Sequence, residues 1–432
     1  MIVNDSRTHL LPAPPDDPDV LVIGLGYVGL PLAAEATRCG LAVVGYDRDE
    51  TVVGGLNAGR SHIGDVPSAD VQAMLEGKFR ATTDEATVGS PATVIICVPT
   101  PLTADNGPDL TAVRSAVELA SRQLRPGALV VLESTTYPGT TDEVVRPMLE
   151  KGSGLTAGRD FSLGFSPERI DPGNAAFGIR NTPKIIGGIT PSCTEAIAAF
   201  YGKLCDQVIR AASAREAEMA KLLENTYRHV NIALVNEMAI FCHELGVDLW
   251  DAIRCASTKP FGFQPFYPGP GVGGHCIPID PNYLSYKVRR LGYPFRFVEL
   301  AQEINGRMPG YVVLRATELL NQNKKPVNGS RVLMVGVTYK KDCADLRESP
   351  AVSVARQLWR AGAQVAYCDP YVSEWSVDGR RVDVGHPLAD AVAAADLVIL
   401  LQAHSAYDLD DIDRRAQLLL DTRGVTTAGE RL

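Results

Sequence analysis

The fold is decided by one stretch near the start of the chain, Val20-Leu21-Val22-Ile23-Gly24-Leu25-Gly26-Tyr27-Val28-Gly29. Its four leading apolar residues predict a buried strand, and three glycines follow at the spacing G-x-G-x-x-G. Leu30 to Cys39 then predicts a helix, and Leu41 to Tyr46 predicts a second strand that ends at Asp47. A strand, a glycine turn, a helix and a strand in this order are typical of a Rossmann unit that binds a dinucleotide.

Each glycine of this turn has its own expected role. Gly24 would allow the tight turn, Gly26 would let a pyrophosphate approach the backbone, and Gly29 would let the helix and strand pack closely. Asp47 would accept a hydrogen bond from a ribose 2′-hydroxyl and repel a 2′-phosphate, which favours NAD over NADP. Neighbouring residues expected to surround this cofactor are Tyr27, Val28 and Arg48.

The composition bounds the class of protein. A length of 432 residues suggests two to four domains, and 45% hydrophobic with 22% charged residues is typical of a soluble globular protein. A net charge of −9 with both signs interspersed gives no electrostatic reason to expect nucleic acid or a membrane as partner. No apolar run reaches the ~18 residues of a transmembrane helix. We expect residues 1–19, rich in proline and aspartate, to form a flexible leader.

The cysteines point to a reducing compartment. The chain has nine, scattered without a C-x-x-C pair, and no signal peptide precedes them. We therefore expect free thiols in a cytoplasmic protein, and we expect no metal site.

Two further strands end in loops that could touch the cofactor. Ala92 to Val98 leads into Pro99-Thr100, and Ala128 to Leu132 leads into Glu133-Ser134-Thr135. Ligands of open α/β sheets bind beyond the carboxyl ends of the strands, so we expect cofactor contacts from both loops. Pro99 and Thr100 are equally consistent with an ordinary strand break. The residues concerned are Val98, Pro99, Thr100 and Thr135.

A strand near Phe161–Phe165 leads into Ser166-Pro167-Glu168-Arg169-Ile170-Asp171. A carboxylate at such a strand end, here Glu168, is a candidate acid or base and, with Arg169, a candidate substrate contact. The alternative for Glu168 is a surface salt bridge.

From Ser213 to Leu245 the chain contains no glycine or proline and predicts one helix of unusual length. Such a helix commonly bridges domains or forms a dimer interface. Lys221 and Asn225 lie four residues apart, so they share a face and can point at one ligand atom. The alternative is a solvated face of the helix.

The segment Gly269–Asp280 places four glycines before Cys276 and a carboxylate, Asp280, four residues after it. Glycines let the backbone approach a ligand, and a thiol beside such a loop is a candidate nucleophile if a neighbour accepts its proton. A buried free cysteine after a flexible turn is the simpler alternative. The preceding aromatic segment, which includes Phe266 and Tyr267, suits a wall for a sugar or base, or a plug between domains.

The C-terminal part repeats the order strand, turn, helix, strand, acid. Strands are expected at Arg331–Val337 and Ala363–Cys368, the second ending at Asp369, with a helix at Ala351–Arg360 between them. The glycine fingerprint of the first unit is absent and lysines replace it, so we expect a smaller Rossmann-like domain with phosphate contacts from Tyr339, Lys340 and Arg423. Its later strands are expected at Leu397–Leu401 and, as the last, Leu418–Leu420.

Taken together, these motifs resemble the UDP-glucose/GDP-mannose 6-dehydrogenase family. The resemblance runs from about residue 18 to about residue 425 and includes, in family order, GLGYVG, VPTP, EST, SPERI-DPG, the Lys-Asn helix, GVGGHC-IPID and YKKD-ADLRESP. It implies an α/β fold with two Rossmann-like doubly wound domains joined by a central helical domain with one long helix. The domains implied are an NAD-binding domain at 20–210, a central dimerisation domain at 211–322 and a UDP-binding domain at 323–432.

The resemblance also implies the chemistry: two hydride transfers from C6 of a nucleotide-linked hexose to NAD, which give a uronic acid. Cys276 would carry the thiohemiacetal and thioester. Lys221 and Asn225 would hold the oxygen on C6, Asp280 would position water or accept a proton, and Glu168 would assist hydrolysis. Family contacts carried over to matching positions are Thr135 near the water and nicotinamide, Arg347 at the cofactor pyrophosphate, Tyr339 and Lys340 at the UDP, and Gly271 and Gly273 at the substrate.

The segment around Cys276 resembles the branch of the family that oxidises UDP-N-acetylhexosamines, UDP-GlcNAc above all. UDP-glucose enzymes of the family typically carry an arginine before the loop and Cys-Phe-x-Lys-Asp, whereas this chain has Lys259-Pro260-Phe261-Gly262 and Cys-Ile-Pro-Ile-Asp. UDP-glucose or TDP-glucose is the alternative substrate. A two-electron hydroxyacid dehydrogenase and a non-catalytic nucleotide-sugar sensor are the more distant alternatives.

Overall fold

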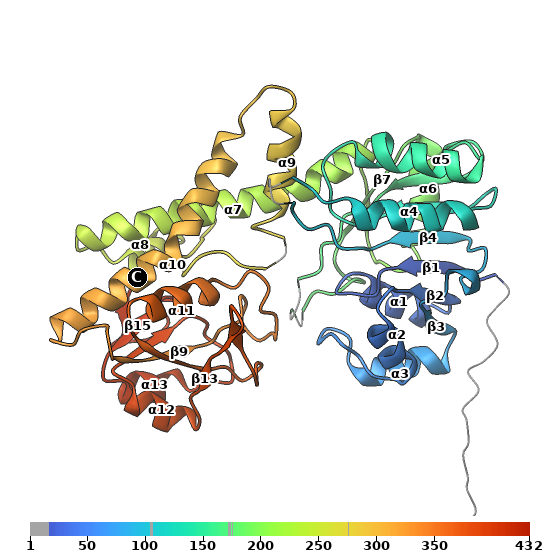
Figure 1. The fold of residues 1–432 in the computed structure, drawn as a ribbon. Helices are drawn as coiled ribbons and strands as arrows, with labels where there is room; N and C mark the ends of the chain where they lie inside the picture. The colour runs from blue at the N-terminus through green and yellow to red at the C-terminus, as the bar shows by residue number, and fades with distance from the viewer. Residues whose placement is uncertain (1–16, 104–106, 172–173, 175, 275) are drawn as a thin grey trace, which may run out of the picture. The chain divides into compact units, whose positions relative to one another are not determined.

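The structure is a computed structural model that describes residues 17–103, 107–171, 174, 176–274 and 276–432. The described chain divides into two compact units. The first comprises the residues up to Pro101 together with Asp109–Met219, and the second comprises Leu102–Pro108 and Ala220–Leu432. The three domain boundaries expected from the sequence stay a prediction. Figure 1 shows the ribbon of the chain.

The first unit is built on an eight-stranded sheet in the order β3-β2-β1-β4-β5-β6-β7-β8. Neighbouring strands pair in parallel except β6 and β7, which are antiparallel. All four residues of β1 are buried, as expected for a central strand of a parallel sheet. The strands are β1 (Val20–Ile23), β2 (Val43–Tyr46), β3 (Phe79–Thr82), β4 (Thr93–Ile96), β5 (Leu129–Leu132), β6 (Ser162–Phe165), β7 (Lys184–Gly188) and β8 (Val208–Arg210).

Helices cover both faces of this sheet, so the fold is doubly wound (Figure 1). One core packs the sheet against α1, α3 and α6, and the other packs it against α4 and α5. Short turns of 3₁₀ and π helix occur at Glu85–Thr87 and Thr141–Val145. The helices of this unit are α1 (Gly29–Arg38), α2 (Glu50–Asn57), α3 (Ser68–Glu76), α4 (Thr111–Gln123), α5 (Arg146–Ser153) and α6 (Pro191–Tyr201).

The second unit carries a six-stranded parallel sheet in the order β13-β10-β9-β14-β15-β16. Helices α10 and α11 pack on one face and α12 and α13 on the other. A two-stranded ribbon, β11 with β12, lies outside this sheet. The strands are β9 (Arg331–Val335), β10 (Gln364–Cys368), β11 (Ser376–Val377), β12 (Arg380–Arg381), β13 (Asp383–Val384), β14 (Leu397–Leu400), β15 (Leu419–Asp421) and β16 (Glu430–Arg431).

The long helix expected from Ser213 to Leu245 is present as α7, which spans Ala214–Glu244 over 31 residues. The fold class is therefore confirmed: α/β, with two doubly wound Rossmann-like sheets and a long helix between them in the chain. The other helices of the second unit are α8 (Leu249–Ala256), α9 (Asp280–Arg289), α10 (Arg296–Gln322), α11 (Pro350–Arg360), α12 (Leu388–Ala394) and α13 (Leu409–Arg415).

Three details differ from the sequence expectations. Helix α10, which the sequence analysis did not expect, has 27 residues and contains Pro309. The expected last strand, observed as β15, is followed by β16. Most of the expected leader, residues 1–16, lies outside the described residues, but its end is not loose: Pro18 is buried and Asp17 pairs with Arg125 at 3.2 Å.

Candidate active site

The glycine turn of the first unit has the geometry that a dinucleotide requires. Gly24 has φ +94°, and a Cβ there would lie 2.6 Å from the carbonyl oxygen of Cys97. A Cβ on Gly29 would lie 1.8 Å from the carbonyl oxygen of Gly24, which shows how closely α1 packs on the turn. Gly26 instead faces open space, with no heavy atom within 4 Å of its would-be Cβ. A phosphate can therefore approach the backbone at Gly26.

Asp47 is held in place by the backbone around it. Its Oδ2 accepts from the Leu25 N–H at 2.8 Å and its Oδ1 from the Asp49 N–H at 3.0 Å. The carboxylate is partly exposed and Arg48 beside it is exposed, as are parts of Tyr27 and Val28. Contacts of these residues with ribose stay a prediction.

The two loops expected beside the cofactor are tied to each other. The Thr100 hydroxyl donates to the carbonyl oxygen of Thr135 at 2.8 Å, and the Ser134 hydroxyl donates to that of Val98 at 2.7 Å. Thr100 is buried, whereas Pro99 is exposed. The loops after β4 and β5 thus form one ledge at the carboxyl edge of the sheet.

A buried ionic cluster that the sequence did not indicate lies next to this ledge. Lys184 at the start of β7 places its Nζ 3.0 Å from Glu133 Oε2 and 3.6 Å from Glu168 Oε2. The Tyr201 hydroxyl donates to Glu133. Burial raises the pKa of Glu133, and the charges of Glu133 and Glu168 raise the pKa of Lys184 against the effect of its own burial. Glu168 is therefore neither on the surface nor isolated.

The side chains of the loop after β6 are also fixed by local contacts. Glu168 Oε1 accepts from the backbone N–H groups of Arg169 and Ile170. The Arg169 guanidinium donates to the Pro183 carbonyl at 2.7 Å. Arg169, expected as a substrate contact, is thus engaged with its own unit in this structure.

In the second unit, α7 and α9 bring three of the expected catalytic residues together. Lys221, Asn225 and Asp280 are all buried, with exposed fractions of 7%, 3% and 2%. The Asn225 amide donates to Asp280 Oδ2 at 2.6 Å. Asp280 opens α9, and its own N–H donates to the Cys276 carbonyl at 2.8 Å. The cysteine, the amide and the carboxylate therefore share one small region.

Arg228 is a member of this group that the sequence analysis missed. It stands one turn beyond Asn225 on α7 and donates to Asn225 Oδ1 at 3.2 Å. With its oxygen facing Arg228, the Asn225 amide must present an N–H group to Asp280. The signal was present in the sequence, because Asn225 lies four residues after Lys221 and Arg228 lies three residues after Asn225, so all three share one face of a helix.

The protonation state of the group follows from its burial. Burial raises the pKa of Asp280 to about 7, and the charge of Lys221 and the hydrogen bond from Asn225 limit the rise. Burial and the charge of Asp280 raise the pKa of the Cys276 thiol, against the charges of Lys221, Arg228 and Arg347. Cys276 therefore rests as a thiol, and a role of Asp280 as its proton acceptor stays a prediction.

The glycines before Cys276 lie directly against the loop that carries Tyr339. A Cβ on Gly273 would lie 2.6 Å from Tyr339 Cβ, and one on Gly274 would lie 2.7 Å from the Tyr339 ring. Gly271, at φ +129°, would meet the backbone oxygen of Asn305 and the ring of Pro350 at 3.3 Å. The loop can come this close only without side chains.

The start of the same loop is held by a chain of buried amides. Asn236 on α7 accepts from the Gly269 N–H at 2.9 Å and donates to Asn305 on α10 at 2.9 Å. The Asn305 amide donates to the His229 carbonyl at 3.2 Å. Burial lowers the pKa of His229 to about 4, so this histidine is neutral. Helices α7 and α10 thus fix one end of the Cys276 loop.

The remaining expected site residues occupy several places in the second unit. Arg347 is bound to Asp345, with Nη2 to Oδ2 at 2.6 Å. Arg423 donates to the Leu401 carbonyl at 2.7 Å, and burial lowers its pKa to about 10. The Phe266 ring packs edge-on against Tyr227, and Tyr267 is 52% exposed. The Lys340 carbonyl accepts from the Thr338 hydroxyl.

The expected site thus falls into two groups. Cys276, Asp280, Lys221, Asn225 and Tyr339 belong to the second unit. The glycine turn and the residues Asp47, Thr100, Thr135 and Glu168 belong to the first. Among the described residues no cluster of His, Cys, Asp or Glu could hold a metal ion, and no helix is long and apolar enough to cross a membrane.

Comparison with known proteins decides the family. Models of the UDP-glucose/GDP-mannose dehydrogenase family match in all three parts: the NAD binding domain at residues 19–205, the central domain at 215–307 and the UDP binding domain at 333–428. The chain belongs to this family. It is therefore an NAD-dependent dehydrogenase with a UDP-sugar as its class of substrate.

Relatives within the family share most of their length with this chain. A UDP-N-acetyl-D-glucosamine 6-dehydrogenase from Pseudomonas aeruginosa is 37% identical over 90% of this chain and 92% of the relative. An NDP-N-acetyl-D-galactosaminuronic acid dehydrogenase from Ralstonia solanacearum is 34% identical over 95% and 96%. The solved structure of a UDP-D-ManNAc dehydrogenase from Pyrococcus horikoshii matches with a TM-score of 0.86 at 32% identity, over 94% and 96%.

Proposed function

We propose that this family member oxidises C6 of a UDP-N-acetylhexosamine from alcohol to carboxylate in two steps, with UDP-GlcNAc as the first candidate. The observation that carries the proposal is the group of Asp280, Asn225 and Lys221, all buried, beside the half-buried Cys276. An alcohol-to-aldehyde oxidation needs no thiol. A route to the acid in one site needs a nucleophile that holds the aldehyde carbon, and Cys276 is that nucleophile.

The residues of the first unit fit the cofactor. The open face at Gly26, the turn at Gly24 and the Asp47 carboxylate would hold the pyrophosphate and a ribose of NAD. When bound, NAD supplies the hydride acceptor for both oxidations. Arg347, from the second unit, would add a contact to the pyrophosphate, and Val98, Pro99, Thr100 and Thr135 would line the cofactor.

The residues of the second unit divide the work on C6. The Lys221 ammonium and the Asn225 amide stabilise negative charge on the C6 oxygen. Asp280 takes the Cys276 proton as the sulfur adds to the aldehyde, which gives a thiohemiacetal. Loss of a second hydride converts this adduct to a thioester, and water assisted by Glu168 cleaves it to the carboxylate and returns the thiol.

The choice of sugar rests on two observations. The segment from Lys259 to Asp280 contains no arginine, and Ile279 stands where the UDP-glucose enzymes carry the lysine of the Cys loop. The two relatives and the solved structure above are named for three different N-acetylated hexoses, with GlcNAc, GalNAcA and ManNAc in their names. All three names contain an N-acetylated hexose, but the three sugars differ in the configuration of the ring, so the names support the class of sugar and not one particular sugar.

The proposal is tested by counting NADH formed per limiting substrate with UDP-GlcNAc, UDP-GalNAc, UDP-ManNAc, UDP-glucose and TDP-glucose. We expect two NADH and a uronic acid from one of the N-acetylated sugars. Turnover of a glucose nucleotide alone would overturn the sugar. One NADH per substrate would fit a two-electron dehydrogenase, and none with all five would fit a sensor.

The role of Cys276 is tested by Cys276→Ser, with Cys255→Ser on the exposed end of α8 as the matched control. We expect formation of the acid to fall on the order of a thousandfold or more in the first variant, since the hydroxyl is a far weaker nucleophile. The control variant should keep the two-NADH stoichiometry. Acid formation at the normal rate by Cys276→Ser would exclude the thioester route.

A further inference from the structure

The second unit repeats the arrangement of turn glycine and acid that forms the dinucleotide site of the first unit, and we call this arrangement the frame. Gly336 follows β9 as Gly24 follows β1, and both have positive φ, +78° and +94°. Asp369 follows β10 and accepts from the Val337 N–H at 2.7 Å, as Asp47 accepts from Leu25 at 2.8 Å. The other carboxylate oxygen corresponds as well. Asp369 Oδ1 accepts from the Tyr371 N–H at 2.9 Å, and Asp47 Oδ1 accepts from the Asp49 N–H at 3.0 Å.

The two frames differ in what lies beside the acid. In the first unit Asp47 is partly exposed and able to meet a ribose. In the second, His404 Nε2 lies 3.1 Å from Asp369 Oδ2, and both side chains are fully buried. The rings of Tyr371 and Tyr407 flank the imidazole edge-on, with centroids at 5.0 and 5.4 Å. Asp369, which stands where a dinucleotide site has its ribose-binding acid, is therefore bonded to a buried histidine and not open to a ribose.

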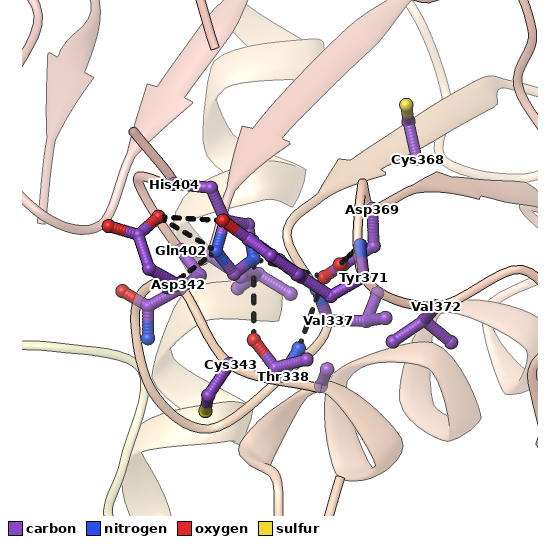
Figure 2. A network of polar contacts seen from close by, with 12 residues as sticks. Val337, Thr338, Asp342, Cys343, Cys368, Asp369, Tyr371, Val372, Gln402 and His404 are labelled. Carbon is purple, nitrogen blue, oxygen red and sulfur yellow. Dashed lines mark hydrogen bonds and ion pairs between the residues drawn. The ribbon is translucent and has the colours of Figure 1, made fainter. Parts of the chain in front are cut away.

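The second nitrogen of His404 holds the turn that replaces the glycine fingerprint. His404 Nδ1 accepts from the Asp342 N–H at 2.9 Å, so Nε2 carries the proton and donates to Asp369. Figure 2 shows the imidazole between Asp342 and Asp369. Asp342 has φ +57°, a conformation that non-glycine residues keep only when contacts hold it. Its carboxylate accepts from the N–H and hydroxyl of Ser405, both at 2.7 Å.

The same network reaches the two residues expected at the UDP. The Thr338 hydroxyl donates to the Lys340 carbonyl at 2.9 Å and lies 3.3 Å from His404 Nε2. Gln402, two residues before the histidine, donates to the Tyr339 carbonyl at 3.1 Å. The backbone of the turn is thus held at Thr338, Tyr339, Lys340 and Asp342 by the loop after β14 and by Asp369.

We propose that His404 and Asp369 form a positioning pair that anchors the turn Thr338–Asp342 and so presents Tyr339 and Lys340 to the nucleoside diphosphate. The pair reuses the ribose-binding acid of a dinucleotide site as an internal anchor. The second unit is thereby closed to a second dinucleotide at Asp369. The inference rests on the proposed function, in which this turn contacts the UDP.

The inference is tested with UDP itself, by titration calorimetry on the full-length protein, together with the KM values for the UDP-sugar and for NAD. We expect His404→Ala to weaken UDP binding and raise the KM for the UDP-sugar by roughly tenfold, the effect of about one lost hydrogen bond to a positioned turn. The KM for NAD should change by less than about twofold, since Asp47 has its own frame.

Two further variants separate anchoring from loss of folding. The Asn side chain places an oxygen where His Nδ1 stands, so His404→Asn keeps the acceptor for Asp342 and should recover most of the UDP affinity. His404→Gln places its amide near Nε2, keeps the partner of Asp369 and should behave as His404→Ala. Equal UDP affinity in all variants, or equal loss for UDP and NAD together, would overturn the inference. Wild-type protein that fails to bind UDP would overturn the nucleotide assignment itself, and the inference with it.

Discussion

At the scale of single residues, Asp280 is the group whose environment makes the clearest pH prediction. Its pKa is raised to about 7 by burial, against an ordinary value of about 4. If Asp280 is the base for Cys276, kcat/KM for the UDP-sugar should fall below pH 7 as the carboxyl becomes protonated. Asp280→Asn should lower the rate on the order of a hundredfold and remove this acidic limb. A limb that persists in the variant would assign it to another group.

The raised pKa of Asp280 also affects stability, but in the opposite direction: activity should increase as the pH rises, whereas the free energy of unfolding should decrease. A carboxyl that binds its proton more tightly when folded stabilises the protein below pH 4, and this contribution is lost as the pH rises through 7. We expect Asp280→Asn to be more stable than the wild type at pH 8, by at most about 4 kcal/mol for a shift of roughly three pKa units. Urea unfolding at pH 5 and 8 measures it, with exposed Asp410→Asn as the control.

Arg228 gives a second prediction at this scale. It orients the Asn225 amide, and its charge lowers the pKa values of both Cys276 and Asp280. Arg228→Met should reduce kcat/KM by roughly three- to tenfold, a modest effect because the guanidinium is largely exposed. It should also move the acidic limb to higher pH. Arg228→Lys keeps the charge and should leave the limb in place; a limb that moves equally in both variants contradicts the charge effect.

What the sequence could reveal at this scale depended on spacing. Lys221, Asn225 and Asp280 were found because helix geometry or a glycine-rich loop brings them to notice. Lys184 was missed, because no local sequence pattern links it to Glu133 or Glu168, the two carboxylates with which it pairs. Contacts between residues far apart in the chain follow from the sheet order, which the sequence did not supply.

At the scale of elements, the cluster around Lys184 joins β5, β7 and the loop after β6. Lys184→Met leaves Glu133 buried without its positive partner, and removal of one member of a buried ion pair costs about 3–5 kcal/mol. We expect a loss of this size in urea unfolding. The exposed Lys203→Met should change little. Adding Glu133→Gln to Lys184→Met should restore part of the loss, and a purely additive double variant would contradict the coupling.

The glycine loop before Cys276 makes a second prediction for an element. Gly274 has φ +86°, and its would-be Cβ lies 2.7 Å from the Tyr339 ring. Gly274→Ala should therefore cost about 1–3 kcal/mol and raise the KM for the UDP-sugar as the loop moves off Tyr339. Gly306→Ala is the matched control, because Gly306 lies inside α10 and a Cβ there would meet no heavy atom within 4 Å apart from the helix's own backbone. This change should be neutral or stabilising by up to about 1 kcal/mol. Similar losses from both changes would contradict the close packing.

Among the elements, those with a clean pattern were predicted and those with a broken one were not. The strand β1 and the helix α7 lie within one residue of the expected bounds, because β1 is an unbroken apolar run and α7 contains no glycine or proline. Helix α10 escaped because Gly306, Pro309 and Gly310 interrupt it, and those signals normally end a helix. Tertiary packing against α11 overrides them here.

At the scale of the whole molecule, the remaining prediction concerns a second copy of the chain. Five large apolar side chains on α7 and just past its end are 45–70% exposed. At 100° per residue they fall within a 40° stripe, on the side of the helix opposite Lys221 and Asn225. They are Leu223, Tyr227, Leu234, Phe241 and Leu245. A continuous apolar stripe of this length is typical of a helix that packs against a partner.

We therefore expect the protein to form a homodimer through α7, with the face of the helix that carries Lys221 and Asn225 left free. Leu234→Glu would place a charge in the middle of the stripe and should convert the dimer to a monomer, measured by light scattering after gel filtration. Leu291→Glu, at a leucine 67% exposed just beyond α9, should leave the assembly unchanged. A wild type that is monomeric at micromolar concentration, or a Leu234→Glu variant that stays dimeric, would show that the stripe serves another purpose. Because the stripe and the proposed catalytic residues Lys221 and Asn225 lie on the same helix, a monomeric Leu234→Glu that also loses activity would tie assembly to the site through α7 itself.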